Sequence, residues 1–185
     1  MPNETFAGTW PFAPRFTDSA GFRQHYVDEG PSEGEVILCL HGEPTWGYLY
    51  RNMIGPLAEN FRVVVPDHMG FGKSETPKDR IYTLQTHVEN LERFVADLDL
   101  SGITIVCQDW GGPIAGAFTA RNTHLVKRLF LMNTVLGYGG GQSAGGKTPW
   151  FKWIEKHEEA GTLNGILGEL GSTVLSVMKI IGFQN

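Results

Sequence analysis

Residues 103–112, with the sequence ITIVCQDWGG, decide the fold of this chain. Their apolar, mostly β-branched first half predicts a buried strand, and residues 113–121 after them predict a helix. Asp109 therefore stands at the turn of a strand–turn–helix unit, between the small residues Cys107 and Gly111. Small residues at these positions are typical of a nucleophile elbow, a strained turn in which the helix packs close to the strand. Asp109 is therefore the candidate nucleophile.

Strand-like and helix-like segments alternate on both sides of this unit. Residues 35–40 (EVILCL) and 61–65 (FRVVV) are continuous apolar runs, which are typical of strands buried on both faces of a parallel sheet. Further strands are expected at 22–28 and 125–132, and further helices at 49–59 and 84–98. The last of these helices has one apolar stripe and follows Thr83, a favourable N-cap. The alternation predicts an α/β protein with a mostly parallel sheet and helices on both faces.

Three loops follow strands of this predicted sheet, at residues 41–46, 67–74 and 109–112. Ligands of such sheets bind beyond the carboxyl ends of the strands. We therefore expect the functional site where these three loops meet.

The character of the sequence changes after Asn133. Residues 137–146 contain six glycines, which predicts a hinge. Residues 150–159 predict a helix, and residues 162–183 are apolar but interrupted by glycines, so we expect them to be partly helical. The predicted organisation is an N-terminal part of an α/β core at 1–136 and the start of a helical cap at 137–185.

Composition excludes several classes of function. The 185 residues carry a net charge of -5 and no long Lys/Arg cluster, which argues against a nucleic-acid partner. No apolar run reaches the ~20 residues that span a bilayer, and the first ten residues do not resemble a signal peptide. Cys39 and Cys107 lie in strand-like runs and are expected to be buried, reduced thiols, which favours a cytoplasmic protein. No Cys/His cluster has the spacing of metal ligands.

An aspartate at the elbow indicates a particular chemistry. A carboxylate at a helix N-terminus is stabilised in its ionised form and can attack an sp3 carbon without help from a base. The product is an alkyl ester, which water can cleave, whereas a serine would form a stable ether. Asp109 therefore indicates cleavage of a carbon–halogen bond or an epoxide. The alternative is that Asp109 merely caps the helix.

The neighbours of Asp109 fit an anion in an apolar pocket. The indole N–H of Trp110 is a donor without acceptor capacity, although a Trp is also common in a core. The backbone N–H groups of Glu43 and Trp110 are candidates for an oxyanion hole around Asp109. His41, at a strand end before glycine, is expected to be a structural hydrogen-bonding residue.

A second motif in the sequence indicates a different function. Residues 141–148 (GQSAGGKT) match the phosphate-binding pattern G-x-x-x-x-G-K-[ST]. That loop should directly follow a strand and open a helix, but residues 134–140 intervene and Pro149 disfavours helical angles at Thr148. A nucleotide-binding function is therefore a remote alternative.

Five segments, taken in order, resemble the haloalkane dehalogenases of the α/β-hydrolase superfamily. They are HGEPTW (41–46), YLYR (48–51), PDHMGFGKS (66–74), QDWGG (108–112) and LMN (131–133). The resemblance implies that Asp109 is the nucleophile, that Trp110 donates to the departing halide, and that the N–H groups of Glu43 and Trp110 form the oxyanion hole. It implies a small halogenated alkane and water as substrates, with no cofactor and no metal.

The chain departs from the family pattern in two places. Where many members have an Asn that donates to halide, this chain has Glu43. The resemblance to the branch of the family with Glu at this position implies a cap Trp as the second donor, either Trp153, which we prefer, or Trp150. The His base and its acid partner are absent, and Asn133 occupies one position that the acid takes in some members. We therefore expect an N-terminal portion of a longer enzyme, inactive or limited to a single turnover.

Two alternatives to a dehalogenase stay open. An epoxide hydrolase of the same superfamily needs a cap Tyr as acid, and only Tyr138 lies near. A non-catalytic remnant that binds small apolar ligands or a partner is the other alternative. The sequence leaves the preferred haloalkane and the oligomeric state open.

Overall fold

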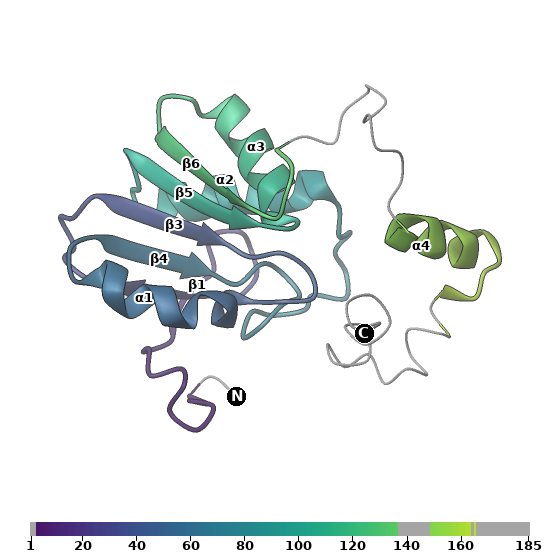
Figure 1. The fold of residues 1–185 in the computed structure, drawn as a ribbon, viewed down its shortest axis with the longest axis horizontal. Coiled ribbons are helices and arrows are strands. Elements are labelled where there is room, and N and C mark those ends of the chain that lie inside the picture. The colour runs from purple at the N-terminus through teal and green to yellow at the C-terminus, as the bar shows by residue number, and fades with distance from the viewer. Residues whose placement is uncertain (1–2, 137–148, 164, 166–185) are drawn as a thin grey trace. The chain divides into compact units, whose positions relative to one another are not determined.

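A six-stranded sheet organises the first part of the molecule (Figure 1). The computed structural model describes residues 3–136, 149–163 and 165. The strand order is β1-β2-β4-β3-β5-β6, in which β4, β3, β5 and β6 are parallel and β1 and β2 are antiparallel additions at one edge. The strands are β1 Arg15–Thr17, β2 Gln24–Glu29, β3 Val36–Leu40, β4 Arg62–Pro66, β5 Ile103–Gln108 and β6 Val126–Met132.

Helices cover both faces of this sheet, as the sequence predicts. A 3-10 turn (Gly47–Tyr50) leads into α1 (Arg51–Ala58), which packs on one face against side chains such as Ile37 and Val63. On the other face lie α2 (Leu84–Asp97) and α3 (Gly111–Arg121). The predicted α/β class with a mostly parallel sheet is therefore confirmed.

Local sequence signals explain the second helix well. The Thr83 hydroxyl accepts a hydrogen bond from the backbone N–H of Thr86 at 3.1 Å, so Thr83 is the N-cap that the sequence predicts. Val88, Leu91 and Val95 are buried in the core and belong to the predicted apolar stripe. The stripe faces the sheet because residues three and four apart share one side of a helix.

The two thiols are free and buried, as expected. Burial raises the pKa of Cys39 to about 12 and that of Cys107 to about 11, because a thiolate would lose its water. Both side chains therefore act as small apolar groups of the core.

The chain divides into two compact units, Met1–Tyr138 and Gly139–Asn185. The described part of the second unit contains α4 (Pro149–Glu159), which the sequence also predicts. The predicted hinge, the phosphate-loop match and most of the apolar segment 162–183 lie outside the described residues. No helix in the described part of the chain is both long and apolar enough to span a membrane.

Candidate active site

Asp109 occupies the turn between β5 and α3 with a backbone φ of 50°. Positive φ is strained for a residue other than glycine and is characteristic of functional turns. A Cβ added to Gly111 would lie 2.2 Å from the backbone oxygen of Leu40, so only glycine lets α3 start this close to β3. The elbow that the sequence predicts is therefore present.

The Asp109 carboxylate bonds the loop after β3. The N-cap position of α3 belongs to Trp110, and no side-chain cap bond is made there. Instead, Asp109 Oδ1 accepts a hydrogen bond of 2.9 Å from the backbone N–H of Glu43, in the loop after β3. One carboxylate oxygen is thus held by the backbone, an arrangement suited to an oxygen that becomes the carbonyl of an ester.

Gly42 and Glu43 pack directly against Asp109. A Cβ on Gly42 would approach the Asp109 Cβ at 2.4 Å and the Trp110 nitrogen at 2.6 Å, so this loop and the elbow touch through the backbone. The pKa of Glu43 is raised, first by loss of water around its carboxyl and then by the negative charge of Asp109. A carboxylate here disfavours an anion, which fits the expectation that Glu43 contributes its backbone rather than its side chain.

Asp67 fastens the loop that follows β4. Its fully buried carboxylate accepts three hydrogen bonds of 2.8 Å, from the Gly47 N–H, the Lys73 N–H and the Nδ1 of His25. This network joins β2, β4 and the loop after β3. Asp67 therefore ties its own loop to β2 and to the loop after β3.

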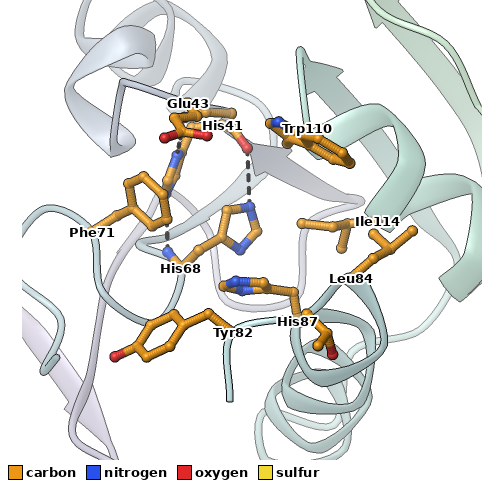
Figure 2. Close-up of a pocket in the computed structure, with 11 residues that line it drawn as sticks. His41, Glu43, His68, Phe71, Tyr82, Leu84, His87, Trp110 and Ile114 are labelled. Atoms are coloured by element: carbon orange, nitrogen blue, oxygen red, sulfur yellow. Dashed lines mark hydrogen bonds between the residues drawn. The ribbon is translucent and has the colours of Figure 1, made fainter. Parts of the chain in front are cut away.

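A cavity of about 330 Å³ lies beside the elbow (Figure 2). Its wall combines apolar side chains with three histidines, and its lining residues are His41, Gly42, Glu43, His68, Phe71, Tyr82, Thr83, Leu84, His87, Trp110 and Ile114. Trp110 thus reaches the cavity next to Asp109, as the predicted halide donor must. The structure adds His68 and His87, whose place in the wall the sequence analysis missed because they come from different elements.

The histidines of this wall resist protonation. Burial lowers the pKa of His41, against the opposing charges of Asp67 and Asp109. Burial lowers the pKa of His68 well below 6.5, and the nearby His41 and His87 lower it further. The pKa of His87 is lowered by burial and then by His41.

Acidification is therefore expected to destabilise the fold. Below about pH 6.5 the unfolded chain binds more protons at these histidines than the folded chain does, so the free energy of unfolding decreases as the pH decreases. The full stability is present above pH 6.5. Urea unfolding at pH 7.5, 6.5 and 5.5 measures how steeply the free energy of unfolding changes with pH. His87→Gln should reduce that slope by an amount equivalent to up to about one bound proton. A free energy of unfolding that is constant from pH 7.5 to 5.5 would contradict this expectation.

The remaining candidates lie in the second unit. Trp150 and Trp153 belong to α4, and the Trp153 ring contacts that of His157 at 4.5 Å between centroids. Their part as the second halide donor stays a prediction. In the described part of the chain, no group of three His, Cys, Asp or Glu side chains is placed to hold a metal ion.

Comparison with known proteins agrees with the α/β fold described above. A family model described as alpha/beta hydrolase fold matches residues 35–163. A haloalkane dehalogenase of Psychrobacter cryohalolentis is 39% identical over 165 residues, covering 86% of this chain and 54% of that protein. A cis-3-alkyl-4-alkyloxetan-2-one decarboxylase of Xanthomonas campestris is 41% identical over 139 residues, covering 70% of this chain and 46% of that protein.

The solved structure of a tetrameric haloalkane dehalogenase from Paraglaciecola agarilytica aligns with a TM-score of 0.72 and 37% identity, covering 82% of this chain and 52% of that one. The chain spans about half the length of the curated relatives it matches. The family model covers most of the chain, including the elbow and the loops around it. The protein therefore belongs to the alpha/beta hydrolase fold family.

Proposed function

We propose that Asp109 is the nucleophile of a haloalkane dehalogenase reaction. The observation that carries the proposal is the hydrogen bond of 2.9 Å from the Glu43 N–H to Asp109 Oδ1, at a strained elbow beside a largely apolar cavity. With Oδ1 held, Oδ2 attacks the carbon that bears the halogen. The halide leaves with the electron pair of the carbon–halogen bond, and Asp109 becomes an alkyl ester.

Tryptophan donors receive the departing halide in this proposal. Trp110 lines the cavity, so its indole N–H is the first donor in this proposal, and Trp153 or Trp150 from α4 is the second. Hydrolysis of the ester then needs a water activated by a general base. We assign that base, and the acid that orients it, to no residue of this chain, so the expected reaction of these 185 residues is a single alkylation.

The test combines 1-bromobutane with a record of free bromide and of intact mass. We expect one bromide and one added butyl group per chain, both lost in Asp109→Asn. Asp99 is a matched control, because it also has a positive φ (49°) but lies exposed after α2, and Asp99→Asn should alkylate normally. Bromide release that continues without a mass gain would place a working base within this chain. A wild-type chain that gains no butyl group and releases no bromide would refute the nucleophile.

A lactone substrate is the second candidate, favoured by the 41% identity to the oxetan-2-one decarboxylase. Asp109 would attack the sp3 ring carbon that is bonded to the ring oxygen. The bond between that carbon and the oxygen breaks, and the carboxylate so released is the leaving group. Loss of carbon dioxide then forms the alkene and expels the Asp109 carboxylate, so no water and no base are required. Repeated alkene formation from a cis-3,4-dialkyl-oxetan-2-one, measured by gas chromatography, would favour this substrate over haloalkanes.

A further inference from the structure

Two buried histidines at the ends of neighbouring strands hold each other in place. His41 follows β3 and His68 follows β4, and their ring centroids lie 4.3 Å apart. The backbone N–H of His68 donates to His41 Nε2 at 3.0 Å, and His68 Nε2 bonds the backbone oxygen of His41 at 3.0 Å (Figure 2). The two bonds run in opposite directions and fix both the ring and the carbonyl of His41.

These bonds determine which ring nitrogens carry protons. His41 Nε2 accepts from an N–H, so the proton of its neutral ring is on Nδ1. That Nδ1–H donates to the backbone oxygen of Gly42 at 2.9 Å. A carbonyl oxygen only accepts, so the proton of His68 is on Nε2. The burial of both rings agrees with neutral imidazoles.

The planar peptide that joins Gly42 to Glu43 transmits this arrangement to Asp109. In a trans peptide the C=O and N–H point in opposite directions, so fixing the Gly42 oxygen fixes the direction of the Glu43 N–H. That N–H donates to Asp109 Oδ1. We propose that His41, clamped by His68, is a positioning residue that aims the Glu43 amide at the nucleophile. Its catalytic consequence rests on the proposed function.

Thr45 also holds the Gly42 oxygen, which limits the effect expected from loss of the His41 donor. Its backbone N–H and its hydroxyl also donate to the Gly42 oxygen, at 3.1 and 2.9 Å. Loss of the His41 donor therefore loosens the peptide rather than freeing it. We expect effects of about tenfold, smaller than the 10²–10³ that follow removal of an oxyanion donor.

A pair of polar variants isolates the Nδ1 donor. His41→Asn keeps a donor close to the Nδ1 position, whereas His41→Gln keeps an acceptor that can reach the His68 N–H but loses the donor to Gly42. His124→Leu, in an exposed loop, is the control for loss of a histidine. Both substitutions at 41 retain polarity and similar size, so the comparison does not depend on an apolar residue folding at that position.

The first measurement is amide hydrogen exchange of Glu43 by NMR on the full chain. We expect exchange at Glu43 to be about tenfold faster in His41→Gln than in wild type and close to wild type in His41→Asn, while the Leu38 amide in β3 is unchanged. A general loss of structure would accelerate both amides together. Equal protection of Glu43 in wild type and His41→Gln would overturn the proposal.

The second measurement concerns the ester itself. Chains alkylated by 1-bromobutane are treated with hydroxylamine, whose nitrogen attacks the carbonyl carbon of the ester; the acyl–oxygen bond breaks, butanol leaves and residue 109 becomes a hydroxamate. This step needs the oxyanion donors but no protein base. We expect cleavage to be about tenfold slower in His41→Gln, with rescue in His41→Asn.

The outcomes separate the two proposals. If wild type gains no butyl group and releases no bromide, but Glu43 exchange responds to His41→Gln, the proposed function fails and the positioning role stands. If wild type is alkylated and its ester is cleaved at the same rate as in His41→Gln, the proposed function stands and the catalytic part of the positioning role fails.

Discussion

Asp67→Ala is expected to lower the free energy of unfolding by about 3 to 9 kcal/mol, which would leave much of the chain unfolded at room temperature. The carboxylate is fully buried and accepts hydrogen bonds from three separate segments. Alanine leaves the donors of His25, Gly47 and Lys73 without an acceptor, and each unsatisfied donor costs about 1–3 kcal/mol. Water replaces the carboxylate poorly because the site has no exposure.

Urea denaturation followed by circular dichroism measures this loss. Asp97→Ala is the matched control, because Asp97 is exposed and accepts one bond, from the Thr17 hydroxyl at 2.7 Å. Its cost should stay below about 1 kcal/mol. Asp67→Asn should fall between the two, since an amide keeps one acceptor oxygen but turns a donor towards other donors. An Asp67→Ala chain with the wild-type midpoint would show that this network does not stabilise the fold.

Gly42→Ala is expected to slow alkylation of Asp109 by at least about a hundredfold. The added Cβ would meet the Asp109 Oδ1 at 2.5 Å and the Trp110 nitrogen at 2.6 Å, both well inside contact distance. Relief requires the loop after β3 to move away from the elbow, which breaks the Glu43 bond to Asp109. A displacement of about 1 Å at a reacting group can cost 10²-fold in rate.

The measurement is the rate of butyl transfer from 1-bromobutane, followed by intact mass. Gly55→Ala is the control: Gly55 lies in α1, and a Cβ there has nothing within 4 Å. That variant should alkylate at the wild-type rate and gain up to about 1 kcal/mol of stability, because alanine is a better helix former. Wild-type alkylation by Gly42→Ala would mean that the loop adapts and that the Glu43 contact is dispensable.

Most elements of the fold could be predicted because their signals are local. The apolar runs at 35–40 and 61–65 correspond to β3 and β4, and the stripe after Thr83 corresponds to α2. The three-residue strand β1 was missed, since it is too short for an alternating pattern to be recognised. The predicted helix at 49–59 is a 3-10 turn followed by α1, a difference in hydrogen bonding that periodicity does not resolve.

The sequence by itself determined the α/β class, the elbow at Asp109 and the loops that surround it, because strand and helix periods and small residues at a tight turn are written into neighbouring positions. Only the tertiary structure decided which groups meet. Glu43 and Asp109 are 66 positions apart, and His41 and His68 are 27 apart. Those contacts depend on the order β4-β3-β5 in the sheet, which brings three strand ends to one edge and which no local pattern specifies.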